Sequence, residues 1–266
     1  MNSATIAAPR KVRPRWAVVR YLLVVWKRTF WSSLIESFIA PVLYLLGLGY
    51  GIGQLSDRVG TGGSYMEYIG PALLLAAALQ IATTEASYPV FARFKWDRQF
   101  SAITATPVDS RALADAQVAF IALRAAVAGA VYWLVLLGFG AVGTPSSALL
   151  VPLAALLGAG CGGWSLAFTA FLVNRGDGEG FNVLFRFIVL PLTLFSGSFF
   201  PVTTFPEFIR WVVWFSPLWH ANELGRLAGG QSANGPVTVL HLVFLAALAL
   251  SGLACARRLF TRRLVL

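Results

Sequence analysis

Apolar runs of 18 or more residues recur along this chain, and they leave it few folds to adopt. A helix needs about 20 apolar residues to cross the hydrocarbon of a bilayer, and only helices and closed barrels satisfy every backbone polar group there. The chain is 58% hydrophobic and 12% charged, roughly half the charge fraction of a soluble domain. We therefore expect an all-α integral membrane protein, with one transmembrane domain over 1–266.

The apolar runs predict six transmembrane helices, with glycine or proline in most of the turns between them. The expected spans are 34–53, 67–90, 112–140, 146–173, 181–200 and 237–256.

The basic residues indicate the orientation of these spans. Sixteen of the 21 Lys and Arg residues lie in segments predicted to be inside, and three, including Arg58, lie in segments predicted to be outside. Because basic loops stay in the cytoplasm, both termini are expected there. The net charge of +10 could also suggest nucleic acid, but clusters beside spans favour contact with anionic membrane lipids and no nucleic-acid partner.

Residues 15–31 are expected to form an amphipathic helix that lies in the membrane interface. Apolar residues repeat there every three or four positions, and basic residues every seven on the flank. The apolar positions are Trp16, Val19, Leu23, Trp26 and Phe30, and the basic ones are Arg13, Arg20 and Lys27. A basic segment that only sets the orientation is the alternative.

Residues 191–223 are apolar and aromatic but are interrupted by Pro201, Pro206 and Pro217. Each proline removes a backbone donor and clashes with the preceding turn, so one continuous helix is excluded. We expect a helix that ends near Phe199, followed by a broken re-entrant hairpin over 201–225 on the outer side. The polar residues of this hairpin favour ordinary capping and surface polarity over a role in gating, and they are Glu207, His220, Glu223 and Arg226.

An inner segment at 91–107, FARFKWDRQFSAITATP, mixes aromatic and basic residues and ends at Pro107. The pattern predicts a short amphipathic helix across the cytoplasmic mouth, before a new helix that starts at Asp109 or Ser110. A solvated connector and a protein-docking surface are both open from the residues alone.

Three ionisable residues fall inside predicted spans, where charges are costly. Glu85, Arg124 and Arg186 all lie roughly 8 to 10 Å from the inner face at 1.5 Å per residue. One hypothesis pairs Glu85 with one of the arginines, and the other lets each side chain reach the headgroups. The sequence shows no catalytic spacing, no nucleotide motif and too few histidines for a metal site.

In two stretches the chain resembles the type-2 ABC exporter permeases. They are SYPVFARFKWDRQFSAITATPV (87–108) and LFSGSFFPVTTFPEFIRWVVWFSPLWHANELGR (194–226). The branch with the nodulation-factor (lipooligosaccharide) exporters and the daunorubicin-type resistance exporters is the most similar.

The resemblance implies an exporter of amphiphilic or lipid-linked substrates in the bacterial plasma membrane. Two cytoplasmic ABC ATPase subunits would bind ATP and Mg²⁺, with no cofactor and no enzyme activity on this chain, and a second permease, usually a copy, would complete it. The segment 91–107 would be the coupling helix, with force transmitted by Phe94, Lys95, Trp96, Arg98 and Phe100.

A substrate path along the permease dimer interface is also implied, lined by spans two and five. We assign Glu85, Arg124 and Arg186 to its inner end and Phe195, Phe199 and Phe200 to its outer end.

Two other classes of protein were weighed. A secondary transporter usually carries paired repeats with broken helices at corresponding positions, whereas this chain is broken at one end only. A membrane-embedded enzyme would need clustered His, Asp or Glu at the interface, which the sequence lacks.

Overall fold

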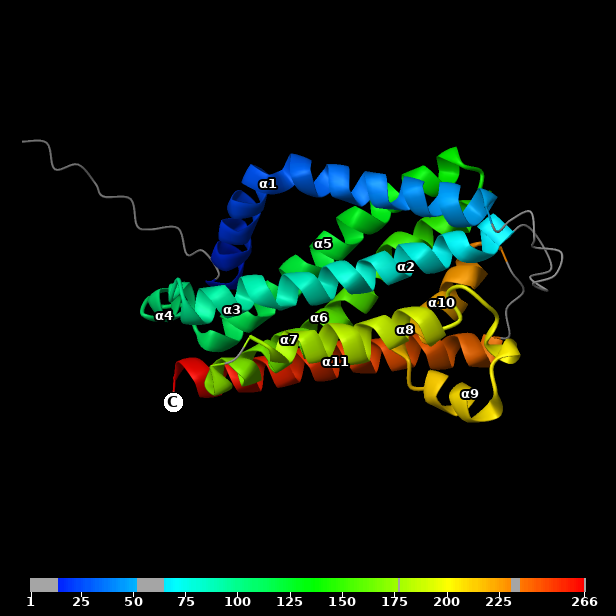
Figure 1. The fold of residues 1–266 in the computed structure, drawn as a ribbon. Helices are drawn as coiled ribbons and strands as arrows, with labels where there is room; N and C mark the ends of the chain where they lie inside the picture. Colours follow the sequence, from blue (N-terminus) through cyan, green and yellow to red (C-terminus); the bar gives the residue numbers. More distant parts are fainter. Residues whose placement is uncertain (1–13, 52–64, 177, 231–234, 266) are drawn as a thin grey trace, which may run out of the picture.

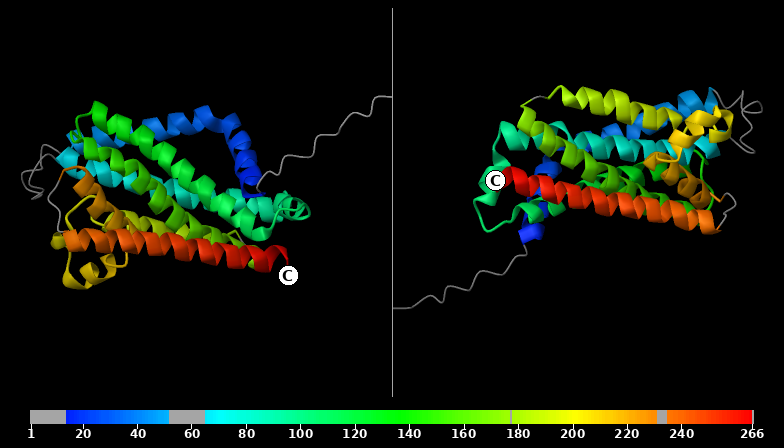
Figure 2. Two further views of the ribbon diagram at one scale, coloured as in Figure 1. Left: turned by 180° about the vertical axis from the view of Figure 1, so that it is seen from behind. Right: turned by 90° about the horizontal axis from the view of Figure 1, so that it is seen from below.

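The computed structural model describes residues 14–51, 65–176, 178–230 and 235–265, and every regular element in these ranges is a helix. The predicted outer loop with Arg58 lies outside them. Five helical stretches are long and apolar enough to cross a membrane, and a sixth, Gly180–Phe195, is shorter. The five are Arg15–Leu48, Tyr65–Lys95, Ser110–Gly138, Pro145–Arg175 and Pro236–Leu264. They form one bundle (Figures 1 and 2), which confirms the predicted all-α membrane protein.

The predicted interfacial helix and first span belong to one helix, α1 (Pro14–Tyr44), which continues into a π-helical turn, η1 (Leu45–Tyr50). The first part of α1, in dark blue, runs at a steep angle to the rest (Figures 1 and 2). The Thr29 hydroxyl donates to the carbonyl of Trp26, and such bonds bend helices. The location of this first part in a membrane interface stays a prediction.

The second span is α2 (Tyr65–Ala86), and α3 (Tyr88–Lys95) extends it along nearly the same line (Figure 1). Ser87 interrupts the helix because Pro89, in the first turn of α3, lacks the N–H that would continue it.

The prediction of a single helix over 91–107 is wrong. In the structure this segment contains the end of α3, an exposed turn, and then α4 (Gln99–Thr104). Arg98, in this turn, has φ of 50°, a left-handed conformation that no apolar pattern reveals. The next helix, α5 (Ser110–Gly138), starts after Asp109 as predicted.

The most buried long helices are α2 and α6 (Leu150–Arg175), and the short η3 (Pro145–Leu149) precedes α6. Both α5 and the more exposed α11 (Gly235–Leu264) pack against α6. Glycines bring α6 and α11 into close contact. A Cβ on Gly163 would lie 2.9 Å from a backbone carbon of Gly252. Backbones approach this closely only where side chains are absent, as is common between membrane helices.

The short apolar stretch contains α7 (Gly180–Val183), the π-helical turn η4 (Leu184–Val189) and α8 (Leu190–Phe195). The helix predicted to reach Phe199 ends at Phe195, because the chain leaves helical geometry at Ser196 and Gly197 takes φ of +70°.

The predicted broken hairpin is present as two helices, after the short η5 (Val202–Thr204). The first, α9 (Glu207–Val213), lies at the edge, and the second, α10 (Pro217–Ala228), is enclosed by other helices (Figure 1). Its re-entry into a membrane stays a prediction.

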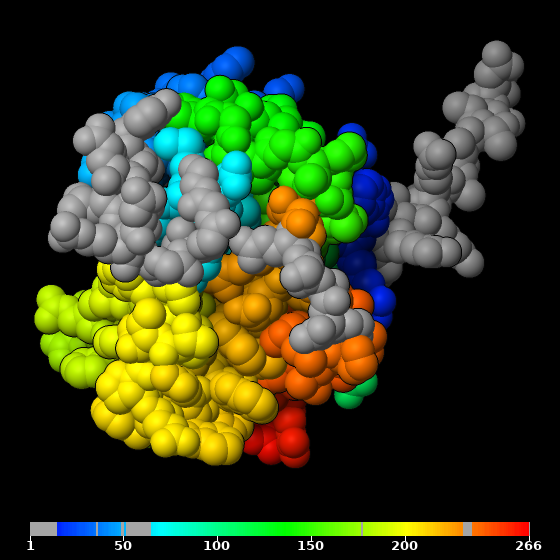
Figure 3. Space-filling view, turned by 90° about the vertical axis from the view of Figure 1, so that its right-hand side faces the viewer, coloured from blue at the N-terminus to red at the C-terminus, as the bar shows by residue number. Residues whose placement is uncertain are grey.

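The two ends of the bundle differ in charge. One end, here called the basic end, holds the start of α1, the α3–α4 turn and the C-terminal end of α11 (Figure 1). Asp115 on α5 joins Arg15 of α1 (3.0 Å) and Arg257 of α11 there. The other end holds α9 and α10 and is called the hairpin end. Figure 3 looks onto it and shows the yellow hairpin residues beside the start of α11 in orange.

Candidate functional site

Two of the predicted force-transmission residues are core residues at the basic end. The ring of Phe94 lies edge-on to Phe100 at 4.7 Å and to Phe260 of α11 at 4.9 Å, and Phe94 and Phe100 are 8% and 1% exposed. Neither can meet another subunit directly. They attach α3 and α4 to each other and to α11, and their role in force transmission stays a prediction.

The other three predicted residues lie at the exposed turn between α3 and α4. We call Lys95, Trp96, Asp97 and Arg98 the α3–α4 tip, since all four are exposed. Lys95 Nζ donates to the carbonyl of Gly176 at the end of α6 (2.6 Å), and the Trp96 ring is 65% exposed. The structure therefore presents a charged, aromatic surface that is anchored to two helices.

The charge pair predicted for the inner half of the spans is present. Arg124 of α5 lies 2.7 Å from Glu85 of α2, donates to Ser33 of α1 at 3.1 Å, and places its guanidinium 5.1 Å from the ring centre of Trp26. The pair therefore links α1, α2 and α5. Arg186, which was the other possible partner, lies on an exposed face of η4.

A cavity of about 710 Å³ lies between the short apolar stretch, α9 and the bundle. Its volume is in the range of ligand pockets. The walls come from α2, α6, η4, α8, α9, α11 and the start of α10, and most of the lining side chains are apolar. The residues are Leu79, Thr83, Cys161, Trp164, Ser165, Phe168, Leu184, Phe187, Ile188, Val189, Pro191, Leu192, Phe195, Ser196, Phe208, Ile209, Val212, Val213, Phe215, Ser216, Pro217 and Leu248.

Only one residue of the predicted substrate path lines this cavity. Phe195 does, whereas Phe199 packs against the core and Phe200 is 46% exposed outside the cavity. Glu85 lies on the other side of α2, since it follows the lining residue Thr83 by two positions, or about 200° around the helix. The structure thus separates the cavity from the ion pair, and the role of these residues in transport stays a prediction.

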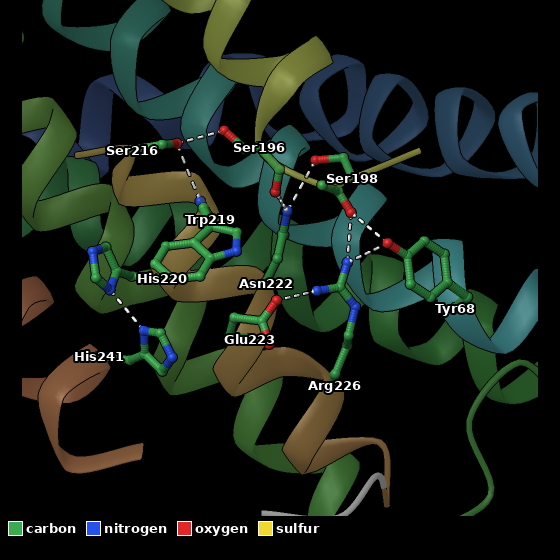
Figure 4. A network of polar contacts seen from close by, with 11 residues as sticks. Tyr68, Ser196, Ser198, Ser216, Trp219, His220, Asn222, Glu223, Arg226 and His241 are labelled. Carbon is green, nitrogen blue, oxygen red and sulfur yellow. Dashed lines mark hydrogen bonds and ion pairs between the residues drawn. The ribbon is translucent and has the colours of Figure 1, made fainter. Parts of the chain in front are cut away.

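A buried polar network connects α10 to the end of α8 and to α2 (Figure 4). Arg226 is 8% exposed and donates to Glu223 (2.6 Å), to the hydroxyl of Tyr68 on α2 (2.8 Å) and to the carbonyl of Gly197. Its guanidinium also lies 4.4 Å from the Tyr68 ring centre. Of these partners, only Glu223 belongs to α10 itself. Arg226 therefore ties α10 to α2 and to the non-helical turn after α8.

Hydrogen bonds from the hairpin complete this network (Figure 4). Asn222 donates to the carbonyl of Ser196 and to the hydroxyl of Ser198, both at 3.0 Å. The hydroxyls of Ser196 and Ser216 bond to each other, and Ser216 accepts from the N–H of Trp219, which caps α10. These hydrogen bonds therefore fix α10 of the hairpin to the segment that follows α8.

The two histidines of the chain meet between α10 and α11. His220 Nε2 lies 2.9 Å from the carbonyl of Trp214, so this nitrogen carries the proton and donates. Its Nδ1 then accepts from Nδ1–H of His241 at 2.7 Å. Burial lowers the pKa of His220 below its ordinary value of 6.5, and the bond to Trp214 offsets part of this effect. The geometry is that of two neutral imidazoles.

Comparison with known proteins identifies the family. Residues 15–228 match the family described as ABC-2 type transporter, which is most of the chain. The chain belongs to the ABC-2 type transporter family. The resemblance predicted from the two sequence stretches is thereby confirmed, and the protein is a multi-pass membrane component of a transporter.

The relatives found for this ABC-2 transporter carry one name. This chain is 29% identical to Nodulation protein J of Rhizobium leguminosarum bv. trifolii over 210 residues, 79% of each chain. It is 28% identical to Nodulation protein J of Sinorhizobium fredii over 251 residues, 94% of this chain and 93% of that protein. Nodulation protein J of Bradyrhizobium diazoefficiens is 26% identical over 257 residues. The predicted nodulation branch is confirmed.

Sequence reasoning misread the polar residues of the hairpin in this ABC-2 transporter. It treated Arg226 and His220 as surface residues, but both are buried. The signal was available: His220, Glu223 and Arg226 recur every three residues in a helix whose remaining residues, apart from Asn222, are not polar, so they share a face. Tyr68 and Gly197 gave no comparable signal, because they lie 158 and 29 positions from Arg226 and only the folded chain brings them together. Among the described residues no metal-binding group of three or more His, Cys, Asp or Glu occurs.

Proposed function

We propose that this ABC-2 transporter is the permease of an ATP-driven exporter, which moves an amphiphilic or lipid-linked molecule out of the cytoplasm or the inner leaflet. The observation that carries the proposal is that α2 and α3 lie along nearly one line, here called one rod, between an exposed surface and the cavity. The exposed α3–α4 tip stands at the end of α3, α3 extends α2, and α2 lines the cavity with Leu79 and Thr83.

Force applied at the tip reaches the cavity along this rod. Phe91 and Phe94 pack α3 against Phe181 and Phe260, so the short helix cannot tilt alone. On the side of α2 that faces away from the cavity, the Glu85–Arg124 pair joins the same rod to α1 and α5. A push on the tip would move α2 relative to α6 and α8 and change the shape of the cavity.

The proposed arrangement has six spans, with the short stretch Gly180–Phe195 as the fifth. Its support is that this stretch runs along the bundle from the basic end to the hairpin end (Figure 1). The basic end would be cytoplasmic, since basic residues stay inside. Both termini would then be cytoplasmic, α9 and α10 would form the extracellular re-entrant hairpin, and the start of α1 would lie in the inner interface.

The proposed complex contains two copies of a cytoplasmic ABC ATPase and a second permease, most simply a copy of this chain. The ATPase would bind ATP and Mg²⁺, so the tip residues Lys95, Trp96 and Arg98 would transmit force without touching a nucleotide. Family membership supports the ATPase partner.

The proposed substrate is a lipooligosaccharide or a similar glycolipid, with an amphiphilic drug as the wider class. The name of the relatives connects them with nodulation, and the apolar walls of the cavity suit a molecule with a hydrocarbon part.

The test uses the chain purified with the ATPase encoded beside its gene and reconstituted in proteoliposomes. ATP hydrolysis should rise when a lipooligosaccharide is added, and the double variant Trp96→Ala/Arg98→Glu should lower stimulated hydrolysis and ATPase retention at least tenfold. Trp31→Ala is the control, because Trp31 on α1 is also exposed, at 75% against 65% for Trp96, and belongs neither to the tip nor to the cavity. Transport that persists without ATP but stops when an ion gradient is dissipated would disprove the proposal.

A further inference from the structure

Along the helix axis, the cavity is about as long as one leaflet of a bilayer is thick. Its lining residues on the short apolar stretch run from Leu184 to Phe195, which at 1.5 Å per residue is roughly 16 Å along the helix axis. The hydrocarbon of one leaflet is about 15 Å thick, half of the usual ~30 Å. The cavity therefore extends from the hairpin end about as far as a lipid chain does.

Its walls offer few polar groups to a charged or sugar headgroup. No charged residue lines it in the part of the chain that the structure describes. The Thr83 hydroxyl donates to the carbonyl of Leu79 at 2.9 Å, and the Trp164 N–H donates to Ser251 at 3.2 Å. The hydroxyls of Ser196 and Ser216 bond to each other. Ser165 also lines the cavity, and its hydroxyl makes no hydrogen bond within the described residues. Because the other polar groups already have partners, most of the interior favours hydrocarbon.

The cavity opens at its rim to the surface that faces lipid. Phe187, Phe208 and Phe215 line it and are yet 73%, 72% and 79% exposed. At its hairpin end, Trp211 and Trp214 of the α9 segment are also exposed. Tryptophans collect at the membrane–water boundary, so they mark the level at which the headgroup of a bound molecule would lie.

We infer that this cavity binds a single acyl chain, with the headgroup at the level of Trp211 and Trp214 and the chain end near Phe168 and Leu184. The inference deepens the proposed function and rests on it for the source of the chain, since a transported lipooligosaccharide and a resident phospholipid present the same hydrocarbon.

The experiment uses the full chain with its ATPase in proteoliposomes and two photoreactive probes. One is a phosphatidylethanolamine with a diazirine in the middle of one acyl chain, and the other is a single-chain acyl saccharide with the same diazirine chain. After irradiation, mass spectrometry should find label on the α6 peptide with Cys161, Ser165 and Phe168, enriched at least fivefold over lipid-facing Val239 and Val243 of α11. Preference for the saccharide would indicate cargo, and preference for the phospholipid would indicate a resident lipid.

A pair of substitutions tests the position. Ile188 lines the cavity and Leu190 does not, although they are similarly exposed, at 48% and 53%. Ile188→Trp should lower labelling of the α6 peptide at least fivefold, and Leu190→Trp should change it less than twofold. If Ile188→Trp does not fold, Ile209→Trp fills the cavity from α9 instead.

Uniform labelling of lipid-facing helices, or labelling of α6 that neither filling variant reduces, would overturn the inference. The labelling needs no ATP hydrolysis, so the two proposals fail separately. A labelled cavity in a chain that no ATPase drives would contradict the proposed function alone, and ATP-driven transport without labelling would contradict the acyl-chain site alone.

Discussion

Arg124 has partners on two other helices, Glu85 on α2 and both Ser33 and Trp26 on α1. The sequence predicted a charge pair because three ionisable residues fall at a similar depth, but it left the partner open. The choice between Arg124 and Arg186 depends on which face of each helix points inward. Only the packing of the bundle determines that, so a single sequence could not decide it.

Exchange of the two charges tests this pair. Glu85→Ala should lower the stability of the folded chain by about 2–4 kcal/mol, because a partly buried charge is left unpaired. Glu85→Arg combined with Arg124→Glu should recover only part of the loss, since a glutamate at 124 cannot reproduce the contact with the Trp26 ring. Thermal unfolding in detergent measures both. Equal stability of the single and the exchanged variants would show that the pair contributes nothing.

The buried His220 predicts a pH dependence. Because its pKa is lowered from 6.5 in the folded chain, the unfolded chain binds more protons just below that pH. The stabilisation is therefore complete above about pH 6.5 and decreases as the pH falls. Thermal unfolding from pH 5 to 8 should show this decrease in the wild type and a flatter profile in His220→Gln. His241 and Glu223 are the nearby titratable groups, and an unchanged profile would assign the effect to them.

The elements show where sequence patterns stop being informative. The long apolar helices α2, α5 and α6 were predicted to within four residues of their bounds, because burial in a membrane requires uninterrupted apolar runs. The span predicted to end at 256 continues for eight more residues, to the end of α11 at Leu264. The segment at 91–107 was predicted as one helix because its aromatic spacing continues through it. The positive φ of Arg98 breaks it, and such a conformation depends on the attachment of both short helices to the bundle.

Gly163 gives a prediction for the contact between α6 and α11. Gly163→Ala should destabilise the protein by about 1–3 kcal/mol, because the new Cβ would lie 2.9 Å from the backbone of Gly252 and neither helix can yield cheaply. The matched control is Gly138→Ala, where a Cβ meets nothing within 4 Å and the loss of glycine should be neutral or stabilising by up to about 1 kcal/mol. Equal midpoints of thermal unfolding for the two variants would contradict the close contact.

At the scale of the whole molecule, the distribution of basic residues and the fold both distinguish one end of the bundle from the other. The sequence alone assigned the ends of the spans from the distribution of basic residues, and the fold brings the start of α1, the α3–α4 tip and the end of α11 to the same end (Figure 1). The cavity and the Arg226 network could not be predicted, because each brings together segments that are distant in the sequence. The cavity is lined by more than four helices, and the network joins α10 to α2 and to the turn after α8.

Cysteine labelling in intact cells tests the orientation. In a chain without Cys161 and Cys255, Thr203→Cys at the hairpin end should react with a membrane-impermeant maleimide, and Ser101→Cys on α4 should react only after lysis. Both side chains are exposed, so accessibility within the fold does not decide the result. Labelling of Ser101→Cys in intact cells would reverse the proposed orientation.

The short stretch Gly180–Phe195 has a consequence for the membrane around it. Its 16 helical residues measure about 24 Å, some 6 Å less than the hydrocarbon of an average bilayer. In the six-span arrangement the surrounding lipid has to thin locally to meet it, at a cost of fractions of a kcal/mol per Å. In that arrangement the hydrophobic mismatch lies beside the opening of the cavity. The bilayer would therefore be thinnest at the place where a lipid molecule leaves or enters the protein.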